Sequence, residues 1–128
     1  MPTTTLKTQL RNPTLALPTG PGSREAAKIA RIILGQMAKY TMPGEPTYTG
    51  GCRTFYTSAE WRARGEDYGR ESLLIVCHDG GDVAEFFSYD AAYDAGSYDM
   101  LERMDEALRA AGYRAEQCTR WYSAIYPA

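Results

Sequence analysis

The chain has 128 residues, of which 44% are hydrophobic and 23% are charged. This length and composition are typical of one globular domain with its own core, which excludes extensive disorder. No stretch reaches the roughly 20 apolar residues of a membrane-spanning helix, and residues 1–11 are too polar for a signal peptide. The three cysteines follow no disulfide or zinc-binding spacing, which favours free thiols and a cytoplasmic location.

Charge is distributed unevenly along the chain. Residues 1–50 hold six basic and two acidic residues, a net charge of +4, whereas residues 79–106 hold nine acidic residues and one arginine, a net charge of −8. The overall net charge of −2 conceals this separation. The chain also has ten tyrosines against three phenylalanines, and tyrosine suits both half-buried strands and binding surfaces.

The N-terminal part is predicted to be an irregular arm followed by a helix. Residues 1–22 contain four prolines, which favour extended or irregular chain. A helix is expected over residues 23–40, with Ser23 as its N-cap and Pro43 beyond its end. Apolar residues recur at helical spacing on one face of this helix, and basic residues cover the other face.

The next part of the chain is predicted to form a strand and a loop. Residues 47–57 are rich in Thr, Tyr and Phe, which predicts a strand interrupted at the Gly50-Gly51 pair. Residues 58–69 are polar and contain glycine. They predict a loop or a short helical turn around Trp61.

Two adjacent strands are expected in the middle of the chain. Residues 73–77 form a continuous apolar run, which is typical of a central strand. The Gly80-Gly81 pair follows at once and predicts a tight hairpin turn into a second strand over residues 83–89. Residues 89–99 are then expected to be a loop.

The C-terminal part is predicted to be a helix and a strand. Ser97 can cap a second helix, and Gly112 can end it. Residues 113–126 predict one bent strand or a hairpin, with Trp121 and Ile125 facing the core.

These elements predict an α+β fold. It consists of an antiparallel sheet of about four or five strands packed with two α-helices. Residues 1–22 form the irregular arm, and residues 23–128 form a single domain.

The strongest cluster of reactive side chains is Cys77, His78 and Asp79, which contains the only histidine of the chain. Adjacent strand residues point to opposite faces, so Cys77 and His78 cannot easily act together. The sequence from Asp79 to Asp82 is typical of a turn, because Asp side chains bond turn backbone. We therefore assign no catalytic residue, metal site or cofactor. A small enzyme centred on His78 and Asp79, or on Cys118, is the third functional hypothesis.

Two segments resemble small uncharacterised accessory proteins of phages and other mobile elements. They are residues 74–82, LIVCHDGGD, and residues 115–126, AEQCTRWYSAIY. The resemblance covers the C-terminal half and brings no catalytic residues. It implies a protein that binds a host protein and blocks or redirects it, as anti-restriction and anti-CRISPR proteins do, some of which look like nucleic acid.

The first functional hypothesis is a non-enzymatic binding protein that engages a basic partner, such as a host protein that handles nucleic acid. Spaced carboxylates and tyrosines can steer onto a basic groove, and the alternative is a solubilising face. The residues concerned, termed the acidic tyrosine surface, are Asp82, Glu85, Tyr89, Asp90, Tyr93, Asp94, Tyr98 and Asp99.

The second hypothesis is a nucleic-acid-binding module that uses the basic arm and the first helix. Its alternative is an ordinary solvated helix face. The residues concerned are Lys7, Arg11, Arg24, Lys28 and Arg31. A homodimer formed by pairing of tyrosine-rich edge strands is a further expectation.

Overall fold

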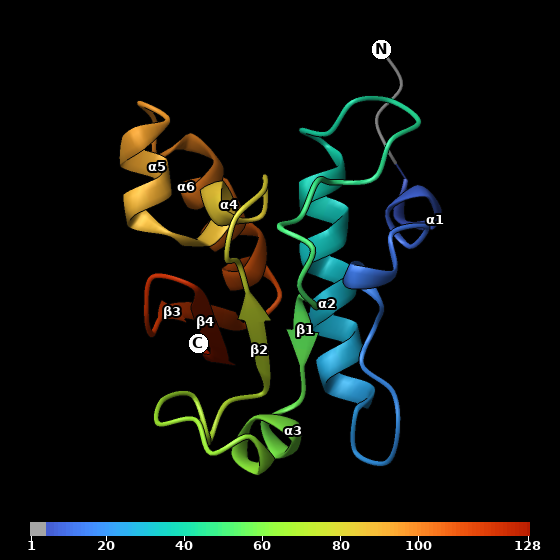
Figure 1. Cartoon of the computed structure of the whole chain (residues 1–128), viewed down its shortest axis with the longest axis vertical. Helices are drawn as coiled ribbons and strands as arrows, with labels where there is room; N and C mark the ends of the chain where they lie inside the picture. The colour runs from blue at the N-terminus through green and yellow to red at the C-terminus, as the bar shows by residue number, and fades with distance from the viewer. Residues whose placement is uncertain (1–4) are drawn as a thin grey trace.

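A four-stranded antiparallel sheet lies at the centre of the structure, a computed structural model that describes residues 5–128 (Figure 1). The strand order is β1-β2-β4-β3, so β2 and β4 lie inside the sheet and β1 and β3 form its edges. The strands are β1 (Phe55–Tyr56), β2 (Leu74–Cys77), β3 (Tyr113–Gln117) and β4 (Tyr122–Pro127). The central position predicted for residues 73–77 is confirmed.

Two long helices and several short ones accompany the sheet. They are α1 (Leu6–Gln9), α2 (Arg24–Ala38), α3 (Ser58–Ala63), α4 (Ala84–Phe87), α5 (Tyr89–Asp94) and α6 (Asp99–Ala110), with a 3-10 turn at Pro13–Leu15. The predicted α+β class, the antiparallel sheet and the two longer helices are confirmed. None of the helices within residues 5–128 has the length and apolar character needed to cross a membrane.

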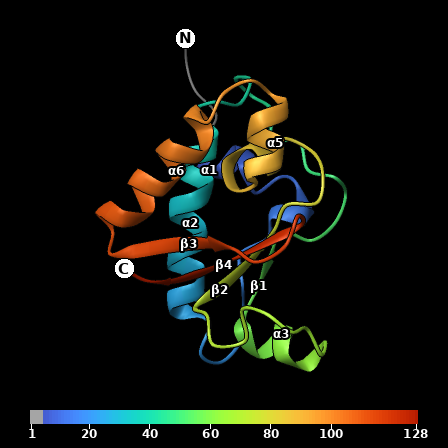
Figure 2. The same cartoon turned by 90° about the vertical axis from the view of Figure 1, so that its left-hand side faces the viewer.

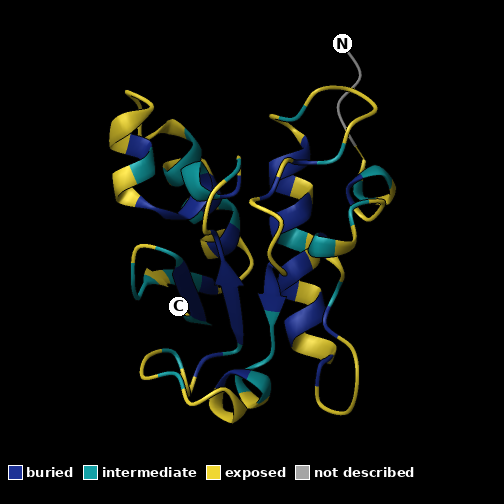
Figure 3. Ribbon diagram, in the orientation of Figure 1, coloured by how far each residue is buried: buried dark blue, intermediate teal, exposed yellow. Residues whose placement is uncertain are grey.

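Helices α2 and α6 pack side by side and cover one face of the sheet (Figure 2). The apolar residues of α2 recur every three or four positions, so they form one buried stripe. Figure 3 shows this burial on the strands and along α2. The first core cluster includes Ile29, Ile33 and Met37 from α2, Met104 and Leu108 from α6, and Leu74, Val76 and Ile125 from the strands.

A second core cluster lies on the opposite face of the sheet. Ile75 and Cys77 alternate along β2 with Leu74 and Val76, so their side chains point away from the first core cluster. The buried members of this cluster are Trp61, Ile75, Cys77, Tyr122 and Ala124, and Tyr56, Cys118, Trp121 and Tyr126 pack against it partly buried.

The sequence predicts that Trp121 and Ile125 both face the core, which is correct only for Ile125. Ile125 is fully buried in the first core cluster. Trp121 is only partly buried and packs on the second core cluster. The two side chains do not share a face because β4 begins at Tyr122, which leaves Trp121 in the preceding turn.

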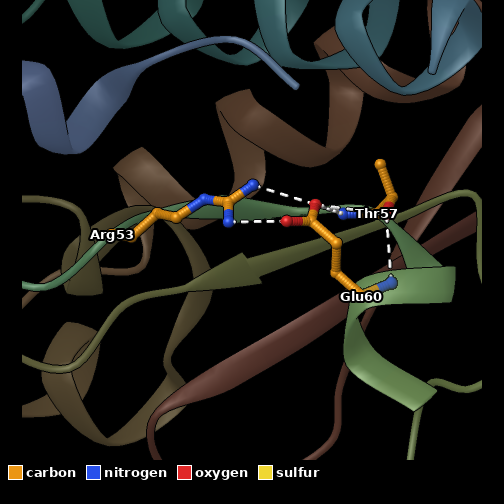
Figure 4. Close-up of polar contacts among 3 residues, drawn as sticks. All are labelled: Arg53, Thr57 and Glu60. Atoms are coloured by element: carbon orange, nitrogen blue, oxygen red, sulfur yellow. Dashed lines mark hydrogen bonds and ion pairs between the residues drawn. The ribbon is translucent and has the colours of Figure 1, made fainter. Parts of the chain in front are cut away.

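Helix α3 carries the largest side chain of the second core cluster and is fixed by a capping box. The Thr57 hydroxyl accepts a hydrogen bond from Glu60 N at 3.2 Å, and the Glu60 carboxylate accepts one from Thr57 N at 3.0 Å (Figure 4). Arg53 binds the same carboxylate through two nitrogens, at 2.7 and 2.9 Å. This arrangement holds α3, and with it Trp61, against the sheet.

The predicted strand over residues 83–89 is wrong, because this segment forms α4 and the start of α5. The loop expected over residues 89–99 likewise contains α5. Gly80 and Gly81 both have positive φ, 92° and 69°, as a tight turn requires. The segment that pairs with this turn is distant in the sequence, however, because Gly81 forms an isolated β-bridge with Thr49. A Cβ atom added to Gly81 would lie 2.6 Å from the Thr49 backbone. The turn therefore packs on residues 48–49 and does not start a hairpin.

The strand predicted over residues 47–57 is much shorter than expected. Only Phe55–Tyr56 pairs with β2, and Thr49 contributes an isolated bridge to Gly81. Gly50 lies so close to the Asp79 carbonyl that any side chain would clash there. The glycine pair thus marks a close approach of two backbones.

The N-terminal arm is irregular apart from two short helical turns, and it packs on the domain. Residues 1–4 lie outside the described residues. Gln9 is fully buried, donates to the Thr47 hydroxyl at 2.7 Å, and accepts from Thr47 N at 2.5 Å. Leu15 is also fully buried and belongs to the first core cluster. The arm is therefore part of the folded structure.

Replacing Gln9 with alanine is expected to destabilise the fold by about 1–3 kcal/mol, since the buried Thr47 N–H loses its partner. The Thr47 hydroxyl loses the Gln9 donor but keeps its hydrogen bond with the Thr41 hydroxyl. Urea denaturation followed by circular dichroism measures the change. The nearby exposed Leu10→Ala variant is the control and should lose clearly less. Equal losses in the two variants would show that the buried amide adds nothing.

Candidate functional site

The acidic tyrosine surface lies mainly on α5 and the start of α6, at the periphery of the molecule (Figure 1). Ser88 begins α5 by accepting a hydrogen bond from Ala91 N at 3.3 Å, and Gly96, with φ of 82°, follows its end. Only Ala92 of α5 is fully buried, so the rest of this helix is largely available to solvent. Figure 3 shows this exposure.

Three tyrosines of this surface are exposed large aromatic side chains. The exposed fractions are 59% for Tyr89, 73% for Tyr93 and 43% for Tyr98. The rings of Tyr89 and Tyr98 lie with their centroids 6.4 Å apart, which joins α5 to the start of α6. Large exposed aromatic rings are characteristic of surfaces that become buried in an interface.

The carboxylates around these tyrosines are only partly neutralised. Asp90 lies 3.6 Å from the Arg120 guanidinium, and both side chains are mostly exposed, so this ion pair is weak. Asp94 and Asp99 form no ion pair with any residue among 5–128. Asp99 is the first residue of α6, where the helix dipole stabilises a negative charge. A negative potential therefore remains at this surface.

Two residues predicted for the surface lie apart from its centre. Glu85 is half-buried on α4. Asp82 precedes α4, and its carboxylate lies 3.4 Å from Tyr48 N, beside a cavity lined by Tyr40, Thr41 and Tyr48. The structure thus brings together Tyr89, Asp90, Tyr93, Asp94, Tyr98 and Asp99, but places Asp82 near residues 40–48.

The basic residues of the second hypothesis are divided between two places. Arg24, Lys28 and Arg31 lie together on the exposed face of the first half of α2. Lys28 Nζ is 5.7 Å from the centre of the Tyr113 ring. Lys7 and Arg11 belong to the arm, where Arg11 donates to the Gly44 carbonyl beyond the end of α2. Figure 1 shows α1 alongside the other half of α2.

The three reactive side chains of the third hypothesis lie in different surroundings. His78 is 1% exposed, with Nε2 at 2.9 Å from the Ser123 hydroxyl and its ring stacked on Phe87. Asp79 is exposed, and Cys118 borders a separate cavity with Tyr68 and Tyr126. Cys77 packs in the second core cluster, so its predicted separation from His78 is confirmed.

Burial keeps His78, Cys77 and Cys118 uncharged at neutral pH. It lowers the pKa of His78 to about 4 and raises the pKa of the Cys77 thiol to about 12. It also raises the pKa of the half-buried Cys118 thiol. Within residues 5–128, no three His, Cys, Asp or Glu side chains gather closely enough to hold a metal ion.

Two features escaped prediction from the sequence. Arg53 and Arg64 lie over the Tyr56 ring, at 4.2 and 5.3 Å from its centre, and shield the second core cluster. A cavity of about 230 Å³ opens between α4, α6 and β3. The helical spacing of the sequence places Leu101, Glu102 and Asp105 on one side of α6. The local sequence does not indicate that β3 forms the opposite wall of the cavity.

Comparison with protein-family models, with curated proteins and with solved structures found no match to this chain.

Proposed function

We propose that this protein is a non-enzymatic binding protein whose acidic tyrosine surface engages a partner protein with a basic surface. The observation that carries the proposal is the exposure of Tyr89, Tyr93 and Tyr98 among the incompletely neutralised carboxylates of α5 and α6. Tyrosine supplies contact area with few rotatable bonds, and the carboxylates supply long-range attraction to a cationic partner.

The proposed partner is a host protein that handles nucleic acid. Such proteins carry grooves lined with Lys and Arg, which spaced carboxylates can occupy in place of phosphates. We also propose an inhibitory role of the anti-restriction or anti-CRISPR kind, which is what the resemblance of residues 74–82 and 115–126 to accessory proteins of mobile elements would imply. Binding, and not catalysis, is the proposed mode of action.

Replacing Asp90, Asp94 and Asp99 together with asparagine is expected to weaken partner binding about tenfold, because each rim charge contributes about 0.5 kcal/mol. The immobilised protein first captures partners from lysate, which mass spectrometry identifies. The affinity of the purified partner is then measured at two salt concentrations. Binding through this surface should weaken as salt screens the charges.

A matched variant neutralises three exposed carboxylates outside the acidic tyrosine surface, in Asp67→Asn, Glu71→Gln and Glu116→Gln. It carries the same change in net charge and should bind the partner nearly as the unmodified protein does. If both triple variants bind as tightly as the unmodified protein, the acidic tyrosine surface is not the interface. If both weaken binding equally, only the total charge of the molecule matters.

A further inference from the structure

The cavity between α4, α6 and β3 combines an apolar bottom with an acidic mouth. Phe86 and Phe87 are each 4% exposed and Met104 is 1% exposed, so these side chains form its inner wall. Glu102 is exposed and stands at its opening. The volume of about 230 Å³ is large enough for one long side chain, but not for a helix or strand.

The cavity adjoins the acidic tyrosine surface directly. Tyr89 belongs to both, and its backbone N–H donates to the Gln117 side chain of β3 at 3.0 Å. Residues 84–110 hold seven acidic residues and two arginines, a net charge of −5. A ligand drawn to this part of the molecule by charge is therefore a cation.

The two carboxylates of the cavity differ in their partners. Asp105 accepts a hydrogen bond from Arg109 Nε at 2.9 Å, and Arg109 itself lines the cavity, so a guanidinium fits at this rim. Glu102 forms no ion pair or side-chain hydrogen bond with any residue among 5–128. One carboxylate at the opening is thus free to receive an external cation.

We infer that this cavity receives an arginine side chain presented by the basic partner, an inference that rests on the proposed function. The aliphatic stem of arginine packs on Phe86, Phe87 and Met104, while its guanidinium meets Glu102 beside the Tyr89 ring. Arginine fits better than lysine, because its planar group binds a carboxylate through two donors and stacks on an aromatic ring. The arginine anchors the complex, and the surrounding charges orient it.

The test compares binding of hexa-arginine and hexa-lysine peptides by NMR titration at low salt. Hexa-arginine should bind at least five times more tightly and should shift the amide signals of residues 101–105 and 115–117. Glu102→Gln should weaken hexa-arginine binding at least fivefold. Glu106→Gln, the same change one turn further along α6 and outside the cavity, should weaken it less than twofold.

A second variant fills the cavity without altering charge. Ala115→Leu places a larger side chain in its wall and should also weaken hexa-arginine binding at least fivefold, with folding checked by circular dichroism. Equal effects of Glu102→Gln and Glu106→Gln overturn the inference and leave the proposed function standing. Absence of binding to either peptide, together with an unchanged partner affinity in the Asp90, Asp94 and Asp99 triple variant, overturns both.

Discussion

Replacing Trp61 with alanine is expected to lower the free energy of unfolding by about 3–5 kcal/mol. Trp61 is fully buried at the centre of the second core cluster. Its ring centre lies 5.2 Å from that of Tyr56, 5.7 Å from that of Trp121 and 4.8 Å from that of Tyr122. Truncation removes these contacts and leaves a cavity. The capping box of α3 and the Arg53–Glu60 ion pair hinder the helix from closing it.

Polar interactions of the Trp61 ring add to this loss. Its Nε1 donates to the Tyr68 carbonyl at 3.2 Å, and the Arg64 guanidinium lies 4.8 Å from the ring centre. Tyr68 also accepts from the Tyr122 hydroxyl at 3.2 Å, so the loop before β2 is attached to the aromatic rings at one carbonyl. Without Trp61, the Tyr68 carbonyl keeps only one of its two side-chain donors.

Urea denaturation followed by far-UV circular dichroism measures the Trp61 effect without relying on tryptophan fluorescence. Trp121→Ala is the matched control, because it removes the same side chain from the partly buried edge of the same cluster. Its expected loss is about 1–2 kcal/mol, near the middle of the range for single substitutions. Equal losses in the two variants would contradict the central position assigned to Trp61.

Lowering the pH from 7.5 to 5 is expected to destabilise the protein by about 2 kcal/mol through His78 alone, and by about 3 kcal/mol at pH 4. Burial lowers the pKa of the folded imidazole from 6.5 to about 4. Nδ1 of His78 forms no hydrogen bond with any residue among 5–128. The backbone of His78 itself, the nearby Asp79 carboxylate and the Tyr122 backbone favour the charged ring and oppose this decrease in pKa, but they do not cancel it.

The direction of the effect on stability follows from which state, folded or unfolded, binds the His78 proton at the higher pH. Above pH 6.5, His78 is neutral in both states and contributes no pH dependence. As the pH falls below 6.5, the unfolded chain takes up the proton while the folded protein does not, so stability is lost. The loss is complete below about pH 4, where the folded imidazole is also protonated.

Free energies of unfolding at pH 7.5, 6, 5 and 4 measure this dependence. Carboxylates also titrate near pH 4, and the His78→Gln variant retains all of them. Glutamine can still bond the Ser123 hydroxyl but does not ionise in this range. The difference in free energy of unfolding between the unmodified protein and the His78→Gln variant should therefore change by about 2 kcal/mol from pH 7.5 to pH 5. If the free energies of unfolding of the two proteins fall in parallel as the pH is lowered, His78 is not a buried neutral group.

The elements predicted correctly are those whose signals are local. Helix α2 has a long apolar period with Ser23 at its start and Pro43 beyond its end, and β2 is a continuous apolar run. Residues 83–89 lack such a signal, because a short apolar run fits a strand or a helix equally well. In the structure the Gly80-Gly81 turn packs on Thr49, more than thirty residues away, and no hairpin follows it. This distant contact cannot be predicted from the local sequence.

The candidate site shows the same division between local and distant information. Tyr89, Asp90, Tyr93, Asp94, Tyr98 and Asp99 lie together because they are neighbours along the chain. Asp82 is separated from them because its partners, Tyr48 N and the Tyr48 carbonyl, come from a distant segment. The cavity needs Ala115 and Gln117 of β3 as well as α6, so only the assembled fold reveals it.

The central position of β2 also bears on how the protein folds during synthesis. Its neighbour β1 is available early, but its other neighbour, β4, spans Tyr122–Pro127 and pairs with β2 along all four of its residues. Until residue 127 has left the ribosome, the sheet can consist of β1 and β2 alone, with half of the central strand's hydrogen-bonding edge unpaired. Nascent chains therefore expose an apolar strand edge until translation of this segment ends, the kind of surface that chaperones protect.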